Sequence, residues 1–191
     1  MINGEGWLKD SIKADLKVIE CLNYTHDSIL PLAVKPSPNL PTLNSIRWYP
    51  SLCLFEPTTV SIGRGTYTPF EVLGSPYLNK TKYTYNFKPV SIDGMSKSPK
   101  HQNKTCYGIS FQDSTAQKFN LDYLVDAYKD LKKYKFYSSR NFFYKLCGTK
   151  KIYDGLKSGK TAEEIEQSFK PELDQYKLTR KKYLLYPDVN D

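Results

Sequence analysis

The residues best suited to chemistry lie in a proline- and glycine-rich stretch, Val34–Pro76. Proline fixes φ and favours extended geometry in the residue before it, so much of this stretch is predicted to form stiff loops. Loops that a rigid scaffold holds in place often carry binding and catalytic groups. The polar side chains that these loops present are the candidate site residues, namely Lys35, Ser37, Asn39, Glu56, Arg64 and Thr66.

Arg64 is the candidate anion-binding group. It stands between Gly63 and Gly65, which allow the backbone to turn tightly around it. A guanidinium held still by its backbone binds a carboxylate through two parallel hydrogen bonds. The spacing fits neither a Walker loop nor a dinucleotide-binding fingerprint. An ordinary turn with a surface arginine is the alternative interpretation.

Glu56 is the candidate acid. It follows the apolar run Ser51–Phe55, which we interpret as a buried strand. A carboxyl group at the end of such a strand is suited to acid catalysis or to accepting a hydrogen bond from a substrate hydroxyl. The alternatives are an ordinary loop glutamate and one paired with Arg64. Glycoside hydrolysis generally uses two carboxyl groups, and no spacing singles out Glu71 or Asp93 as the second.

The patterns around the remaining candidate residues are less specific than those around Arg64 and Glu56. Lys35, Ser37 and Asn39 alternate with prolines, so they face similar directions along an extended segment and suit hydrogen bonds to a polar ligand. Simple loop rigidity explains the same pattern. Thr66 belongs to the second loop. Tyr107 is either a ring that stacks on a ligand or a core aromatic residue.

Composition narrows the classes of ligand. The net charge of +8 favours anionic partners. Nucleic acid is disfavoured, because no RNA-binding, zinc-finger or helix-turn-helix signature accompanies the basic residues. We expect no cofactor and no metal, because the four cysteines and two histidines are isolated from one another in the sequence.

The elements that position these residues are strands first and helices later. Alternating and β-branched residues predict strands, and apolar residues spaced three or four apart predict helices. The class is therefore α+β: a small mixed or antiparallel sheet with long Pro/Gly-rich loops, followed by a C-terminal group of helices. The predicted strands are 15–22, 51–55, 70–73, 83–92 and 105–111, and the predicted helices are 120–134, 141–147, 150–158, one from 161 and one from 171 to about 186.

Two segment types are not expected. No apolar run approaches the length needed to span a membrane. The first 22 residues are too polar and too acidic for a signal peptide. Taken alone, these features predict a cytoplasmic protein without a membrane span.

Several long motifs in a fixed order carry a family resemblance. They are LAVKPSPNLPTLNSI, YPSLCLFEPTTVSIGRGTYTPFEVLGSPYL, KTCYGI and TRKKYLLYPD. Together they resemble the C-terminal part of the NamZ-type exo-β-N-acetylmuramidases, a bacterial family of peptidoglycan-recycling glycoside hydrolases. The resemblance runs from about Trp7 to Asp188. One departure is visible, because the family usually has Phe-Glu-Gly-Thr where this chain has Phe55-Glu56-Pro57-Thr58.

The resemblance implies an activity and a division into domains. Members release N-acetylmuramic acid from the non-reducing end of peptidoglycan fragments, need no metal, and are typically exported, periplasmic or extracellular. Their catalytic glutamate lies in a Rossmann-like N-terminal domain, and a smaller C-terminal domain closes the cleft. By this resemblance, residues 1–28 are the end of that catalytic domain plus a linker, and residues 29–191 are the substrate-cleft domain.

We therefore expect this chain to contribute to sugar binding more than to bond cleavage. Lys35, Ser37, Asn39, Arg64, Thr66 and Tyr107 would position the muropeptide sugar, and Glu56 would have a supporting catalytic role. The missing N-terminal domain would be its partner, and the chain alone would be inactive. A free-standing glycan-binding or interaction module is the alternative, and a nucleic-acid binder is the third possibility.

Overall fold

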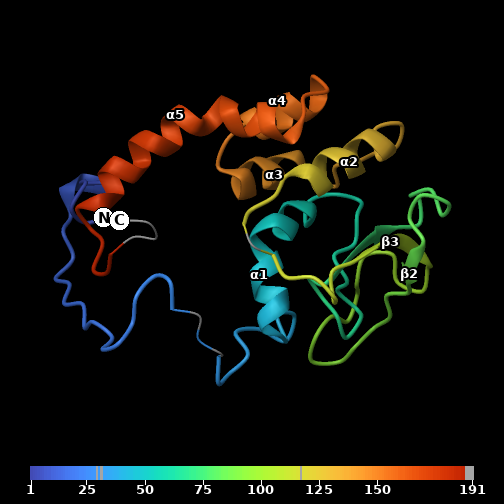
Figure 1. The fold of residues 1–191 in the computed structure, drawn as a ribbon, viewed down its shortest axis with the longest axis horizontal. Coiled ribbons are helices and arrows are strands. Elements are labelled where there is room, and N and C mark those ends of the chain that lie inside the picture. Colours follow the sequence, from blue (N-terminus) through green and yellow to red (C-terminus); the bar gives the residue numbers. More distant parts are fainter. Residues whose placement is uncertain (29, 31, 117, 188–191) are drawn as a thin grey trace. The chain divides into compact units, whose positions relative to one another are not determined.

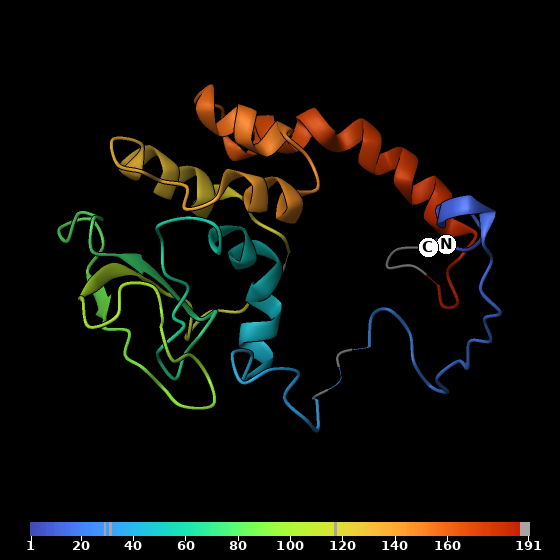
Figure 2. The ribbon, with the colours of Figure 1, turned by 180° about the vertical axis from the view of Figure 1, so that it is seen from behind.

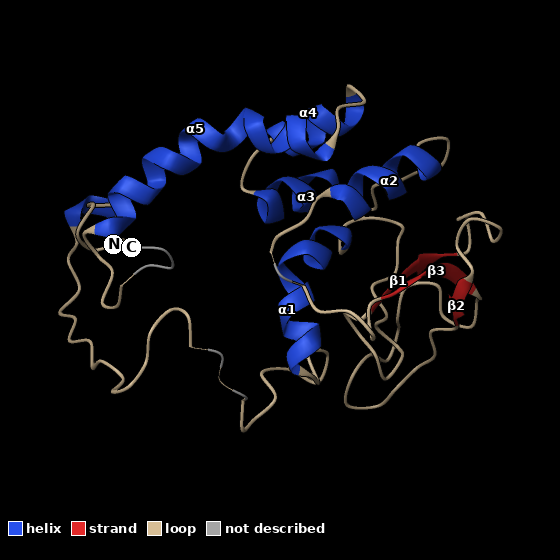
Figure 3. Cartoon of the chain, in the orientation of Figure 1, coloured by secondary structure: helices blue, strands red, loops and turns tan. Residues whose placement is uncertain are grey.

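The computed structural model describes residues 1–28, 30, 32–116 and 118–187. Two compact units are distinguished: Met1–Leu30 with Phe169–Asp191, and Pro31–Ser168. The predicted boundary after residue 28 concerns the domains of a longer protein, and it stays a prediction. The described part contains five α-helices and three strands (Figures 1 and 3): α1 Leu43–Leu52, β1 Val72–Ser75, β2 Tyr85–Phe87, β3 Cys106–Ser110, α2 Asp122–Leu131, α3 Arg140–Cys147, α4 Lys151–Lys157 and α5 Ala162–Lys181.

The fold is α+β, as the sequence predicts. The three strands form one antiparallel sheet in the order β1-β3-β2, with Gly74 opposite Gly108. A Cβ atom on Gly108 would lie 1.7 Å from the carbonyl oxygen of Leu73, so only glycine allows the backbones of β1 and β3 to approach this closely. The predicted strand 83–92 is shorter than expected and comprises Tyr85–Phe87.

The prediction of a strand at Ser51–Phe55 is wrong. Leu52 ends α1, and Cys53–Phe55 continues as a 3-10 helix. Thr42 begins α1 through a capping box with Ser45, in which the Thr42 side chain accepts a hydrogen bond from the Ser45 N–H. The buried positions of α1 are spaced three and four residues apart, as expected for one helical face: Ser45, Trp48, Ser51 and Leu52.

The predicted strand at 15–22 is also wrong. Residues 12–21 form no helix or strand, and Val18, Ile19 and Leu22 are exposed. A strand requires a neighbouring strand to accept its backbone hydrogen bonds, and none pairs with this segment within the described residues. Hydrogen bonds to the C-terminal segment stabilise the smaller unit instead, including those from Tyr183 to Glu5 and from the Cys21 N–H to Tyr186.

The C-terminal helices largely follow the predicted pattern. Gly148 ends α3 in the left-handed conformation, and a capping box between Thr161 and Glu164 precedes α5. The prediction that a new helix begins at Pro171 is wrong, because Pro171 lies inside the continuous α5. Among the described residues, no helix has the length and apolar character required to cross a membrane.

Within the larger unit, Figures 1 and 2 show α2 and α3 above α1, and the strands to one side of α1. The core contains the fully buried rings of Phe55, Phe70, Phe111 and Phe143. Backbone hydrogen bonds join the loop after the 3-10 helix to the start of α3, because the Pro57 oxygen accepts from the Ser138 and Ser139 N–H groups at 2.9 and 3.2 Å.

Candidate functional site

A hollow of about 200 Å³ brings together the two charged residues that the sequence singles out. Glu56 and Arg64 both line it. The remaining lining residues come from the same loop and from the loop before β3, and they are Ser61, Ile62, Ser96, Ser98, Pro99 and Lys100. Three serines and three charged residues therefore line one small space, which suits a compact polar ligand.

Glu56 is positioned by the helical segment that replaces the predicted strand. It is the C-cap residue of Cys53–Phe55, and its N–H donates to the Cys53 oxygen at 2.9 Å. Its carboxylate lies 3.4 Å from Arg64 Nη2. The Glu56 side chain is 22% exposed and that of Arg64 is 39% exposed. The Glu56–Arg64 pair, which the sequence offers as an alternative, is therefore present, and both side chains remain accessible to a ligand.

Arg64 is held from two sides. Its guanidinium carbon lies 5.5 Å from the centre of the Phe70 ring, a cation–π contact. Glu56 contacts one terminal nitrogen, which leaves the other guanidinium N–H groups without a protein acceptor among the described residues. A ring and a carboxylate thus orient the guanidinium while donors remain for an anionic ligand.

Gly65 joins the two loops that form the hollow. Its φ is +84°, and its oxygen accepts a hydrogen bond from the Val90 N–H at 2.8 Å. A Cβ atom at this position would lie 2.5 Å from Pro99 and 2.7 Å from the Val90 oxygen. Glycine is therefore required here both by its backbone conformation and by the close approach of the second loop.

Lys100 is the group that sequence reasoning missed. Its Nζ donates to the backbone oxygens of Phe55, Glu56 and Val60, at 3.3, 3.3 and 2.8 Å. Burial lowers the pKa of Lys100 to about 8, the charge of Glu56 opposes this change, and Arg64 adds to it. Lys100 lies in a run of basic loop residues, and no local pattern distinguishes a buried lysine there from a solvated one.

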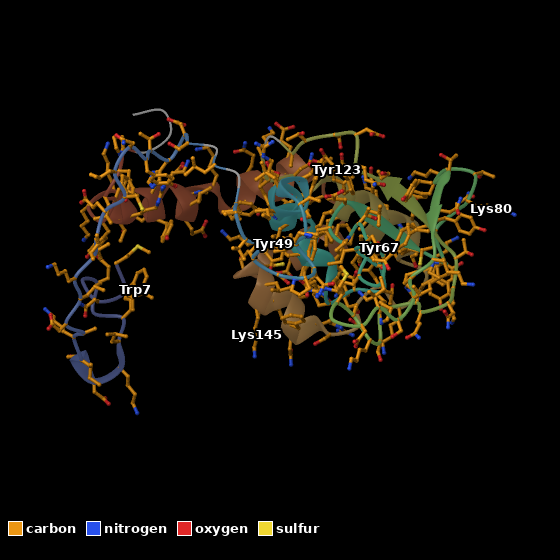
Figure 4. The ribbon with its side chains drawn as sticks, turned by 90° about the horizontal axis from the view of Figure 1, so that it is seen from below. Trp7, Tyr49, Tyr67, Lys80, Tyr123 and Lys145 are labelled. Atoms are coloured by element: carbon orange, nitrogen blue, oxygen red, sulfur yellow. The ribbon has the colours of Figure 1, made fainter. Side chains whose placement is uncertain are left out.

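Tyr49 does not line the hollow, but it contacts the Phe70 ring that lies against Arg64. Its ring is 4.9 Å from that of Phe70, and it is 37% exposed. Burial raises its pKa, with Cys53 and Glu56 acting in the same direction and Arg64 against it. Figure 4 labels Tyr49 together with Tyr67, which follows the Arg64 turn and is 80% exposed. Aromatic rings of this kind supply the apolar contact area on which a sugar ring packs.

The other predicted site residues lie elsewhere or have local partners. Lys35 is exposed and lines a different hollow with Leu32, Pro36 and Leu43. Ser37 closes a turn with Leu40, and its hydroxyl accepts from the Asn39 N–H. The structure therefore does not bring Lys35 into contact with the Glu56–Arg64 hollow.

Three further candidates make structural contacts. The side-chain nitrogen of the buried Asn39 donates to the Met95 oxygen at 3.0 Å. The hydroxyl of Thr66 donates to the Gly63 oxygen at 2.7 Å and so stabilises the turn that presents Arg64. Tyr107 is half-buried on β3, opposite Asn86. Their binding roles stay predictions.

The two alternative carboxylates also lie outside the hollow. Glu71 is buried and accepts a hydrogen bond from the Thr42 hydroxyl. Asp93 is exposed and pairs with Lys97 at 3.4 Å. Glu56 is therefore the one carboxylate among the residues that line the hollow. In the described part of the chain, no three Cys, His, Asp or Glu side chains gather as a metal site would require.

Comparison with known proteins now establishes the family. Residues 47–186 match the sequence profile described as "Exo-beta-N-acetylmuramidase NamZ, C-terminal". The chain belongs to this family. The matched region includes Glu56, Arg64 and Lys100, so the hollow is part of the NamZ C-terminal region.

Two relatives of the NamZ C-terminal chain are informative. Peptidoglycan beta-N-acetylmuramidase NamZ of Bacillus subtilis (strain 168) is 34% identical over 197 residues, which cover 92% of this chain and 47% of that protein. The crystal structure of a DUF1343 family protein from Bacteroides fragilis NCTC 9343 is 44% identical with a TM-score of 0.91, over 98% of this chain and 54% of that one. The chain thus spans about half the length of each relative.

Proposed function

We propose that this chain is the sugar-binding part of an exo-β-N-acetylmuramidase that releases N-acetylmuramic acid from the non-reducing end of peptidoglycan fragments. The observation that carries the proposal is the hollow that Arg64, Lys100 and Glu56 line together with three serines. Family membership and the printed activity of the Bacillus subtilis relative support the same substrate class.

The charges of the hollow match the chemistry of the sugar. N-acetylmuramic acid differs from N-acetylglucosamine by a lactyl group that ends in a carboxylate. Arg64 has unused donors for that carboxylate, and Lys100 adds positive potential although its three N–H groups are occupied by backbone oxygens. Glu56 holds the guanidinium in place and accepts from a sugar hydroxyl.

Bond cleavage in this proposal needs a second region of protein. Glycosidases that use two carboxyl groups place both beside the scissile bond, whereas one carboxylate lines this hollow. A catalytic domain of the kind found in the family would supply the main acid, and Glu56 would assist it. The same observation favours the second candidate, a free-standing glycan-binding module.

Calorimetry with two sugars tests the binding proposal. We expect N-acetylmuramic acid to bind more tightly than N-acetylglucosamine, and Arg64→Ala to reduce the affinity for N-acetylmuramic acid by roughly tenfold, because a charge-assisted hydrogen bond is lost. Arg47→Ala is the matched control, since Arg47 lies outside the hollow. Equal affinity for both sugars in the unmodified chain would refute the proposal.

Hydrolysis is tested separately with a chromogenic β-N-acetylmuraminide. The chain alone should not release the chromophore, whereas a complex with the catalytic region of a relative should. Turnover by the chain alone would show that it contains a complete catalytic centre, and Glu56→Gln would then show whether Glu56 belongs to it.

A further inference from the structure

A second, larger hollow of about 760 Å³ lies among the helices of the Pro31–Ser168 unit. The end of α2, the segment between α2 and α3, the start of α3, and α4 form its walls. The lining residues on which the inference depends are Lys132, Lys135, Arg140, Lys157, Tyr137 and Tyr153. None of them lines the Glu56–Arg64 hollow.

The charge of this second hollow is of one sign. Four of the lining side chains are cationic, and none is a carboxylate. All four cations are exposed, and none forms an ion pair within the described residues. Like charges gathered without a counter-ion repel one another, so an anion entering the hollow would relieve that repulsion.

Tyr137 provides a second, independent sign of a ligand. Its hydroxyl is buried and has no hydrogen-bond partner within the described residues. Its ring packs against Phe136, Phe143 and Tyr153, with centroids 4.9–5.3 Å apart. Burial raises the pKa of Tyr137 far above its usual value, so the hydroxyl remains protonated and able to donate. Leaving such a group unpaired is costly, and a ligand oxygen would satisfy it once a shift of the neighbouring side chains opens the hydroxyl to the hollow.

The start of α3 adds donors at the same place. Ser139 caps the helix by accepting a hydrogen bond from the Phe142 N–H at 3.3 Å. The earlier N–H groups of a first helical turn have no partners within the helix, and the helix dipole makes this end positive. Arg140 and Asn141 begin this turn and line the hollow.

We propose that this hollow is a second glycan-binding site, which holds a carboxylate-bearing stretch of peptidoglycan away from the Arg64 hollow. The cations would bind the carboxylates, the Tyr137 hydroxyl would bind a sugar oxygen, and the tyrosine rings would pack against sugar faces. The identity of the glycan rests on the proposed function, whereas the site rests on these contacts alone.

The test compares two variants that remove equal charge. Lys132→Gln with Arg140→Gln alters the hollow, and Lys133→Gln with Lys145→Gln alters exposed residues that do not line it. Figure 4 shows Lys145 pointing away from the protein body. The probe is a fluorescently labelled, un-cross-linked peptidoglycan strand, and the measurement is fluorescence anisotropy at low and high salt. The full chain is used throughout, and circular dichroism checks that each variant folds.

We expect the hollow variant to bind the strand roughly tenfold more weakly at low salt, and the control to change affinity by less than about twofold. Tyr137→Phe should weaken binding by roughly threefold without lowering the melting temperature, because it removes only the unpaired hydroxyl. Equal losses in the two double variants would overturn the proposal, since the attraction would then be diffuse.

Two further measurements give clear outcomes. A nucleic acid of similar charge that competes equally well, with the same dependence on Lys132 and Arg140, would overturn the assignment to a glycan. Binding of the monosaccharide N-acetylmuramic acid, which reports on Arg64, should be the same in the hollow variant and the unmodified chain. Loss of strand binding with intact monosaccharide binding therefore supports the second site, whereas failure of monosaccharide binding alone refutes only the proposed function.

Discussion

The two hollows use positive charge in opposite ways. In the smaller hollow, Arg64 contacts Glu56 and Phe70, and backbone oxygens occupy all three N–H groups of Lys100. In the larger one, Lys132 and Arg140 have no carboxylate partner within the described residues, and both are exposed.

The difference indicates different kinds of ligand. A pre-organised cation loses little conformational freedom on binding and favours one ligand geometry, which suits a single sugar. Mobile, exposed cations tolerate many geometries and respond strongly to salt, which suits a longer anionic chain. Changes to the backbone should therefore damage the smaller hollow most, and changes of charge should damage the larger one most.

The largest effect is expected from Gly65→Ala. Its φ of +84° and the contacts of a Cβ atom with Pro99 and the Val90 oxygen should destabilise the fold by about 3 kcal/mol. Gly94→Ala is the matched control, because Gly94 also has a positive φ but no atom within 4 Å of the added Cβ, and it should cost about 1 kcal/mol. Urea denaturation measures both. Equal costs would mean that the loop contact at Gly65 contributes nothing.

Lys100→Met should be the next most damaging change. It leaves the backbone oxygens of Phe55, Glu56 and Val60 without their shared donor, at a cost of about 2 kcal/mol. Lys97→Met, at an exposed lysine that pairs with Asp93, should change stability by less than about 0.5 kcal/mol. Thermal unfolding of both variants gives the comparison, and a stable Lys100→Met protein would contradict it.

The pH dependence of sugar binding distinguishes the hollows further. Lys100 has a pKa of about 8, so between about pH 7 and about pH 9 it loses its charge, and affinity for N-acetylmuramic acid should fall by roughly fivefold. The stability effect has the opposite sign. Above about pH 8 the unfolded chain holds this proton more tightly than the folded one, so the stability contribution of Lys100 rises with pH until the usual pKa of 10.5.

Calorimetry across this pH range measures the change in affinity. Lys100→Arg should remove the pH dependence, because arginine stays charged throughout. Unchanged affinity of the unmodified protein between the two ends of the range would show that the charge of Lys100 plays no part in binding. The affinity of the larger hollow for the peptidoglycan strand should not fall over this pH range.

The smallest expected effect is a gain of stability. Tyr137→Phe removes a buried hydroxyl that has no partner among the described residues, and it should stabilise the fold by about 0.5 kcal/mol. Tyr134→Phe, at an exposed ring of the same hollow, should leave stability unchanged. Chemical denaturation in the absence of ligand measures both. A loss of stability in Tyr137→Phe would mean that the hydroxyl already has a partner.

The sequence predicts well those features that depend on local chemistry. Capping residues, the glycine that ends α3 and the apolar spacing of α2 identify helices without reference to the rest of the fold. The pairing of Glu56 with Arg64 is likewise one of the alternatives that the sequence offers, and the structure contains it. The family motifs identified the same family that the profile comparison establishes.

One error arises from a missed local signal, and the others arise where long-range packing decides the structure. The run Ser51–Phe55 is apolar in any conformation, and the capping box of Thr42 with Ser45 begins the helix that extends through Leu52. Residues 15–22 have strand-forming side chains, but no partner strand lies in the described part of the chain. Lys100 owes its role to three oxygens at least 40 residues away in the chain, which no sequence pattern reveals.

The carbonyl oxygen of Pro57 has a consequence for how this region can vary among relatives. It accepts hydrogen bonds from the N–H groups of Ser138 and Ser139, so the residue after Glu56 is held against the two residues before Arg140. An insertion or deletion on either side of these hydrogen bonds would disturb the walls of both hollows at once. Differences in loop length between related chains should therefore accumulate at open turns such as Gly94. The segments around Pro57 and around Ser138 and Ser139 should keep the same length.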